Sequence, residues 1–310
     1  MLITENQRAL TAPKKTTRTK LLVGFLGNYN SANTRSAYKL DLEEFFEFLK
    51  DQFHREKIQI NEVNVEHAHL VVFKESLKRK QYSHSTINRK IAACSTYIEY
   101  LCEENLRRDN PFQRVKRFQG IEPGKTPSLS KEELIVAISK LDNSRPGDVL
   151  AYAICQTMFT TGIRVSGLCD LKLKDINNDR DGVYVSFISK GGKIEKSYLP
   201  SKAIMAIKKY LKLRTDLKGE LLKEDYLFVS FANGAAKRLH RSSVNKMFDR
   251  IFKQLEELGI SPHSARAYFI TEVIKKRGIR EAQERGHHSR IETTTIYDRN
   301  KYSGAIENLV

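Results

Sequence analysis

Apolar residues recur at spacings of three and four in the first third of the chain, and this period predicts three amphipathic helices. The first helix begins near Asn33. Its apolar face is formed by Tyr38, Leu42, Phe45 and Leu49. Similar patterns cover residues 65–77 and 87–101, and serines and a threonine suited to N-capping open the last one. Three helices with short polar connections therefore predict a small helical domain that ends before Asn110-Pro111.

A change of pattern separates this region from the rest of the chain. Residues 119–129 contain two prolines and two glycines with little periodicity, so we expect an interdomain linker there. Ser130 then precedes Glu133 by three residues, which is the spacing of a capping box that opens a helix. Accordingly, we expect a first domain over residues 23–118 and a second over 130–310. Residues 1–22 are basic, lack a hydrophobic period and predict a flexible arm.

The second domain alternates between helical and extended patterns. Helical periods over residues 201–213, 242–258 and 263–276 surround a segment of strict alternation at 183–187. That segment, the Gly191-Gly192 turn and the return over 194–199 predict a two-stranded hairpin. The fold class that follows is mainly α with a small antiparallel β-sheet.

The charge of the chain indicates a polyanionic partner. The 310 residues carry a formal net charge of +17 and the pI is about 9.6. Residues 1–120 hold 21 Lys and Arg against 14 Asp and Glu, so both domains are basic, which favours a protein that grips duplex DNA from two sides. An ordinary solvated basic surface is the alternative. The candidate DNA contacts on the first domain are Arg35, Lys39, Lys78, Lys80, Arg89 and Lys90.

Other features restrict the class of protein. The four cysteines lie in apolar helical patterns without a C-x-x-C pair, so we expect reduced, buried thiols and no metal site. The sequence has no apolar run near 18 residues and no signal peptide, which predicts a cytoplasmic protein with no membrane partner. It also lacks the glycine-lysine pattern of a nucleotide-binding loop, so no cofactor is expected.

Four short stretches carry side chains suited to one reaction, the breaking and rejoining of a phosphodiester bond. Arg164 follows Gly162 between two helices, and Arg266 lies one helical turn after His263; two guanidinium groups suit the charge that develops on phosphate oxygens. Tyr297 is a candidate nucleophile, which His263 and the arginines would activate. Lys190, at the hairpin tip, is a candidate general acid for the leaving 5′ oxygen.

In order and spacing these residues resemble the tyrosine recombinases of the phage integrase type. TGIRVSGL, HSAR and TTTIY carry the resemblance in the catalytic domain, and NTRSAYKLDLEEFFEFL with STINRKIAACSTYIEYL are similar to the family's helical, SAM-like core-binding domain. The resemblance implies a C-shaped clamp on DNA, a homotetramer on synapsed sites, a 3′-phosphotyrosyl intermediate and a Holliday junction. It assigns His288 to a hydrogen bond with the phosphate and residues 302–310 to subunit contact. Accessory or directionality factors are further candidate partners.

The chain also departs from the family pattern. Gly167 stands where relatives carry an acidic residue, for which Asp170 or Asp175 could substitute, and His287 replaces the usual glycine before His288. Tyr302 is a rival nucleophile. Three functions stay open: a recombinase for integration, excision or dimer resolution, a weak or inactive DNA-binding regulator, and an enzyme similar to type IB topoisomerases.

Overall fold

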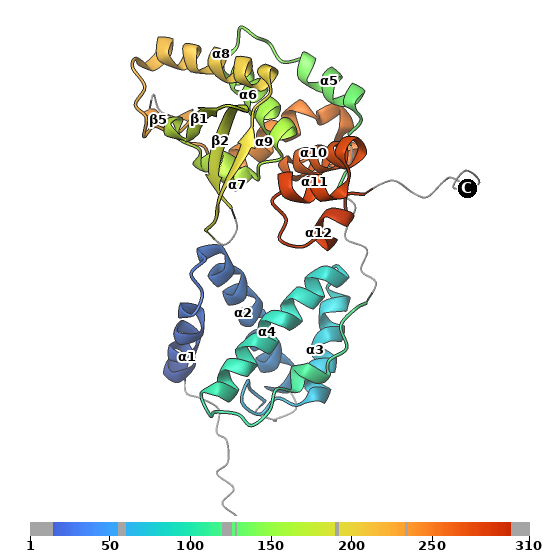
Figure 1. Cartoon of the computed structure of the whole chain (residues 1–310). Helices are drawn as coiled ribbons and strands as arrows, with labels where there is room; N and C mark the ends of the chain where they lie inside the picture. Colours follow the sequence, from blue (N-terminus) through green and yellow to red (C-terminus); the bar gives the residue numbers. More distant parts are fainter. Residues whose placement is uncertain are drawn as a thin grey trace, which may run out of the picture. The chain divides into compact units, whose positions relative to one another are not determined.

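The chain forms two compact units, Met1–Glu122 and Pro123–Val310, which are described separately below (Figure 1). The computed structural model describes residues 15–54, 60–119, 126–127, 129–189, 192–232 and 235–298. Most of the expected linker over 119–129 therefore lies outside the described residues. None of the helices in the described part combines the length and apolar character that crossing a membrane requires.

Four α-helices and a short 3₁₀ helix are described in the first unit. They are α1 (Lys15–Gly27), α2 (Ala32–His54), α3 (His67–Arg79), α4 (His84–Glu103) and η1 (Pro111–Arg114). The predicted apolar face of α2 is buried at Leu42, Phe45 and Leu49. Ser83 caps α4, because its Oγ accepts a hydrogen bond from the backbone N–H of Thr86. The three helices expected from the sequence are thus confirmed.

The expectation of a flexible arm is wrong from Lys15 onward. Helix α1 covers residues 15–27, and Phe25 on it is buried against Tyr38 and Tyr97. Arg18 forms a two-point ion pair with the buried carboxylate of Glu62, with both N–O distances at 2.6 Å. Aromatic packing and this ion pair hold the basic segment on the domain. Residues 1–14 lie outside the described residues.

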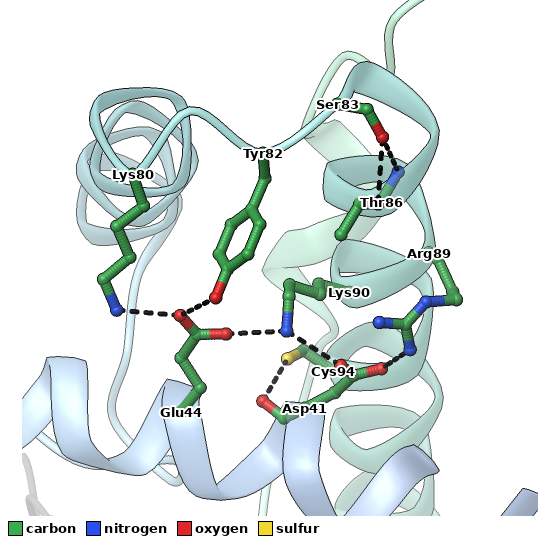
Figure 2. Close-up of polar contacts among 9 residues, drawn as sticks. All are labelled: Asp41, Glu44, Lys80, Tyr82, Ser83, Thr86, Arg89, Lys90 and Cys94. Atoms are coloured by element: carbon green, nitrogen blue, oxygen red, sulfur yellow. Dashed lines mark hydrogen bonds and ion pairs between the residues drawn. The ribbon is translucent and has the colours of Figure 1, made fainter. Parts of the chain in front are cut away.

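The candidate DNA contacts of the first unit divide into exposed and buried groups. Arg35, Lys39, Lys78, Lys80 and Arg89 are exposed, but Lys90 is only 7% exposed, so its assignment to the outer face is wrong. Its Nζ lies 3.0 Å from Asp41 Oδ1 and 2.6 Å from Glu44 Oε2 on α2 (Figure 2). Burial opposes the charge, yet the bonds to Glu44 and Asp41 raise the pKa of Lys90 above its ordinary value.

Acidic side chains of α2 also engage two of the exposed residues. Arg89 pairs with Asp41, and Lys80 Nζ lies 2.7 Å from Glu44 Oε1 (Figure 2). Because Asp41 is 1% exposed, it depends on its two cationic partners for compensation of its charge. These ion pairs of Asp41 and Glu44 thus join α2 to the loop after α3 and to α4. Lys90 is a structural residue of the domain.

We therefore expect Lys90→Ala to destabilise the first unit by about 3 kcal/mol, because it leaves Asp41 and Glu44 with too little positive charge. Lys78→Ala is the matched control, since Lys78 pairs with Glu75 within one exposed helix face, and its loss should cost less than about 1 kcal/mol. Urea unfolding of the full chain, followed by circular dichroism, measures both. Equal stability of the two variants would contradict the structural role.

The second unit combines helices with two small antiparallel sheets. Its helices are α5 (Lys131–Ser139), α6 (Pro146–Thr161), α7 (Val165–Asp170), η2 (Leu173–Asp175), α8 (Ser201–Lys218), α9 (Arg241–Ile251), η3 (Lys253–Leu258), α10 (Pro262–Arg277), α11 (Ile279–Arg285) and α12 (Glu292–Thr295). Its strands are β1 (Ile176–Asp179), β2 (Gly182–Ile188), β3 (Ile194–Tyr198), β4 (Val229–Ala232) and β5 (Ala235–Arg238). The mainly α fold with small antiparallel sheets is confirmed.

The predicted hairpin is the pair β2–β3, in register from Tyr184 opposite Tyr198 to Ile188 opposite Ile194. Val185 and Phe187 point into the core of the unit, in agreement with the alternation of the sequence. Two features were not expected: β1 extends this sheet to three strands, and β4–β5 form a separate hairpin. Each of these three strands has four residues, too few for a clear period.

Helix boundaries in the second unit follow capping signals. The capping box is confirmed, because Ser130 Oγ accepts from the N–H of Glu133 and the Glu133 carboxylate accepts from the N–H of Ser130. The helix expected over 242–258 instead ends at Ile251 and continues as the 3₁₀ helix η3 up to Gly259, with a non-helical backbone at Leu255. Helices α10, α11 and α12 follow, and α11 packs against both of the others (Figure 1).

Candidate active site

Arg164 stands at the sharp junction between α6 and α7. Gly162 ends α6 with a φ of 65°, and a Cβ there would lie 2.4 Å from Phe269 Cδ1, so only glycine fits. Arg164 is the N-cap residue of α7, and its side chain is exposed. The junction thus presents a guanidinium group at the surface of the second unit.

Arg266 reaches the same junction from α10. It is 2% exposed; its Nη1 donates to the carbonyl oxygen of Gly162 at 2.6 Å, and its Nη2 donates to that of Gly286. Burial and the neighbouring charge of Arg164 lower the pKa of Arg266 to about 10, so it remains protonated at neutral pH. The like charges of Arg164 and Arg266 repel each other, and a bound anion would stabilise both. The pair is therefore suited to binding a phosphate.

His288 is fixed in the short segment between α11 and α12. It is 8% exposed, and its Nδ1 lies 2.9 Å from Oγ1 of the fully buried Thr294. Burial, with Arg266 and Arg164 nearby, lowers the pKa of His288 to about 4, so the ring is neutral at pH 7. If Thr294 donates to Nδ1, Nε2 carries the proton and can donate to an anion.

Tyr297 follows α12 and lies between two histidines. Its hydroxyl is 3.4 Å from Nε2 of His263, and its ring stacks on His288 with centroids 5.9 Å apart. Thr271 donates to the Tyr297 carbonyl oxygen, which holds the backbone against α10. Burial raises the pKa of Tyr297, while Arg266 and Arg164 oppose the rise.

His263 has the properties of a base toward this hydroxyl. Burial and then the charges of Arg266 and Arg164 lower the pKa of His263, which favours its neutral ring. In the tautomer that is protonated on Nδ1, Nε2 can accept the phenolic proton. Five of the six predicted catalytic side chains are thus gathered in one unit. The sixth, Lys190, lies outside the described residues.

A pocket of about 600 Å³ adjoins these side chains. Arg164 and His288 line it, together with the ends of the β2–β3 hairpin at Ser189 and Lys193 and the carboxylate of Glu195. Next to the turn of the hairpin, the N–H of Ser189 donates to the Lys193 carbonyl oxygen at 2.8 Å. The pocket therefore opens beside the positive charge of the site.

The two carboxylates considered as substitutes for an acid at position 167 are engaged elsewhere. Asp170 pairs with Arg238, and Asp175 accepts from the N–H of Lys172. A Cβ on Gly167 would lie 3.3 Å from Ile163 and 3.7 Å from Phe187, so this position faces apolar side chains. Two carboxylates that the sequence did not single out line the pocket: Glu284, which is exposed, and Glu195, which is mostly buried.

Sequence reasoning also missed the residues that orient the candidate groups. Thr294 is hydrogen-bonded to His288, and Thr271 donates to the carbonyl oxygen of Tyr297. The carbonyl oxygen of Gly286 accepts a hydrogen bond from Arg266. A signal for Thr294 was present, because it stands within TTTIY, but nothing in the sequence linked it to His288. These contacts join segments that lie far apart along the chain or depend on a particular backbone turn.

Comparison with known proteins identifies the class. The profile of the phage integrase family matches residues 128–303, and that of the phage integrase N-terminal SAM-like domain matches residues 26–105. The chain belongs to the phage integrase family. It is a tyrosine recombinase, as its motifs indicated.

The relatives match this chain over most of its length. Tyrosine recombinase XerC of Bacillus pumilus (strain SAFR-032) is 30% identical over 282 residues, covering 87% of this chain and 86% of the relative. XerC of Roseiflexus castenholzii (strain DSM 13941 / HLO8) is 30% identical over 277 residues, covering 86% and 83%. The XerH site-specific recombinase bound to palindromic difH substrate has a similar fold, with a TM-score of 0.70, 20% identity and coverage of 92% and 85%.

Proposed function

We propose that this recombinase cleaves and rejoins DNA strands at a specific site through a 3′-phosphotyrosyl intermediate on Tyr297. The observation that carries the proposal is the hydroxyl of Tyr297, 3.4 Å from Nε2 of His263 and under the field of two guanidinium groups. The phenol, the neutral base and the permanent cations that phosphoryl transfer needs thus occur together.

In the cleavage step the oxygen of Tyr297 attacks the scissile phosphorus while His263 accepts the phenolic proton. Arg164 and Arg266 stabilise the charge that grows on the non-bridging oxygens, and His288 donates a hydrogen bond to one of them. The bond from phosphorus to the 5′ oxygen breaks, and Lys190 protonates that oxygen. Attack by the 5′ hydroxyl of the partner strand then reverses these steps and releases Tyr297.

The intermediate accounts for the energetics of the reaction. A phosphotyrosyl bond replaces a phosphodiester bond, so the free energy of the broken linkage is kept for rejoining and ATP is not needed. The arginines supply the positive charge that stabilises the transition state. We therefore expect joining without ATP and cleavage in the presence of EDTA.

Exchange between two duplexes determines the assembly. One active site cuts one strand, and complete exchange by way of a Holliday junction requires four cuts, so the functional assembly is a homotetramer on two DNA sites. The basic charge of both units supports a C-shaped clamp around the duplex. The segment 302–310, which lies outside the described residues, is the candidate for subunit contact, and accessory factors would act on this assembly.

The biological event is the integration or excision of a mobile element or the resolution of chromosome dimers, in the cytoplasm. XerC and XerD tyrosine recombinases are among the relatives of this chain, and a Tn1549 transposon integrase has a similar fold. The sequence of the target DNA distinguishes these roles.

A recombination assay with two duplexes carrying the cognate site, in EDTA and without ATP, tests the proposed function. We expect recombinant products in which both strands of each duplex are exchanged. Relaxation of supercoiled DNA without recombinants would instead identify a topoisomerase-like enzyme. Site binding with neither reaction would identify a DNA-binding regulator, and either of these results would contradict the proposal.

A further inference from the structure

A carboxylate and a histidine pair at the wall of the pocket beside Arg164. Glu195 Oε2 lies 3.0 Å from Nδ1 of His287, and Oγ of Ser197 lies 3.3 Å from Nε2 of the same ring. Glu195 and Ser197 are two residues apart on β3 and so share one face of the strand. The His287 and Glu195 side chains are 9% and 18% exposed. Both ring nitrogens of His287 are therefore engaged by a single strand.

These contacts determine the tautomer of the histidine. An ionised carboxylate only accepts hydrogen bonds, so Nδ1 of His287 carries a proton and donates it toward Glu195. In the neutral ring, Nε2 then accepts from the hydroxyl of Ser197. Burial lowers the pKa of His287, Glu195 opposes this, and Arg266 and Arg164 reinforce it. The other carboxylate oxygen of Glu195, Oε1, lies 3.5 Å from Nζ of Lys193, which is 76% exposed.

The backbone of His287 indicates that the ring is needed. Its φ is 50°, in the left-handed region that a residue with a Cβ adopts only at a cost in free energy. Glycine would fit this turn without strain, and glycine is usual here in the family. The contacts of the ring with Glu195, Ser197 and the edge of Phe187 offset the backbone strain.

Phe187 connects this pair to the second departure from the family pattern. Its ring centroid lies 5.3 Å from that of His287, and Cδ2 lies 3.7 Å from where a Cβ on Gly167 would be. Position 167 itself can supply no carboxylate. Phe187 thus contacts both position 167 and the ring of His287, which pairs with the carboxylate of Glu195 on β3.

We propose that Glu195 is a positioning residue of the active site, which acts through His287 and takes the place of the acidic side chain that Gly167 lacks. The pair ties β3 to the segment that continues through His288 to Tyr297. It thereby sets how the phosphate-binding side chains on that segment face Arg164. This inference rests on the proposed function, because the property it explains is the rate of strand cleavage.

The role is tested by single-turnover cleavage of DNA nicked beside the cut site, at saturating enzyme, with site affinity measured in parallel. Glu195→Gln keeps the shape of the side chain and removes its charge. It should slow cleavage about tenfold or more, the scale of a lost charged hydrogen bond, while the affinity for DNA changes less than about threefold. Glu281→Gln is the matched control, since Glu281 is paired with Arg285 on the surface of α11, and it should cleave at the wild-type rate.

A double-mutant cycle separates coupling from general damage. His287→Gly suits the left-handed backbone and should slow cleavage as much as Glu195→Gln does, and the double variant should be no slower than either single variant. The proposal would be overturned if the double variant were slowed by the product of the two single effects. It would also be overturned if Glu195→Gln cleaved within about twofold of the wild-type rate. If the wild type itself fails to cleave, the proposed function fails and this inference falls with it.

Discussion

Replacing Arg164 with alanine should slow strand cleavage by about 10² or more, while leaving stability and site binding nearly unchanged. The side chain is exposed, and within the described residues no hydrogen bond or ion pair engages its guanidinium group. Its loss therefore removes a charge from the transition state without disturbing the fold. Single-turnover cleavage of nicked cognate DNA measures the effect.

Arg266→Ala should behave differently, although it belongs to the same charge clamp. The side chain of Arg266 is 2% exposed and donates to the carbonyl oxygens of Gly162 and Gly286. Arg266→Ala should therefore slow cleavage by a similar factor and also lower the free energy of unfolding by about 2 kcal/mol. Arg180→Ala, at an exposed turn, is the control for both variants and should match the wild type. Normal cleavage by Arg164→Ala would show that its charge does not act on the phosphate.

The parts of the fold that could be predicted are those with strong local signals. Helices α2 and α4 have a regular apolar period and, in α4, a serine cap. The hairpin β2–β3 has alternation on both sides of a glycine turn. In each case the information lies within about 20 residues, so no knowledge of distant partners was needed.

Helix α1 shows where such signals fail. Its sequence begins with lysines, an arginine and threonines, which by themselves indicate a solvated segment. The helix is stabilised by contacts made elsewhere in the domain, with Phe25 packed on Tyr97 and Arg18 paired with Glu62. Tertiary packing therefore overrides local composition, as it commonly does for helices.

The prediction that Lys90 lies on the exposed face was wrong for a different reason. It lies three residues after Ile87 and four before Cys94, both fully buried, so the helical period already placed it on the inner face. Its charge suggested the surface instead. The carboxylates of Asp41 and Glu44 on α2 make the buried position tolerable, and only the structure reveals them.

The candidate site was predictable as a set of residues but not as an arrangement. Arg164, His263, Arg266, His288 and Tyr297 come from motifs, whose roles remain proposals. The contacts that orient them come from Thr294, Thr271 and the pair Glu195–His287, which no local pattern marks. Tertiary distances between α10, β3 and the last segment decide these contacts.

Tyr297→Phe should abolish the covalent adduct while the protein still folds and binds its site. Phenylalanine keeps the ring that stacks on His288 and the carbonyl oxygen that accepts from Thr271, so only the hydroxyl is lost. The hydroxyl oxygen is the attacking atom, so without it no protein–DNA bond can form at position 297. We expect no covalent adduct above the detection limit of the assay.

Tyr302→Phe is the natural comparison, because Tyr302 is the rival nucleophile five residues further on. The nucleophile is identified most directly by incubating the wild type and both variants with DNA nicked beside the cut site and separating the products under denaturing conditions. We expect a protein–DNA adduct with a free 5′ hydroxyl for the wild type and Tyr302→Phe, and none for Tyr297→Phe. An adduct that forms with Tyr297→Phe and is lost in Tyr302→Phe would show that Tyr297 is not the nucleophile.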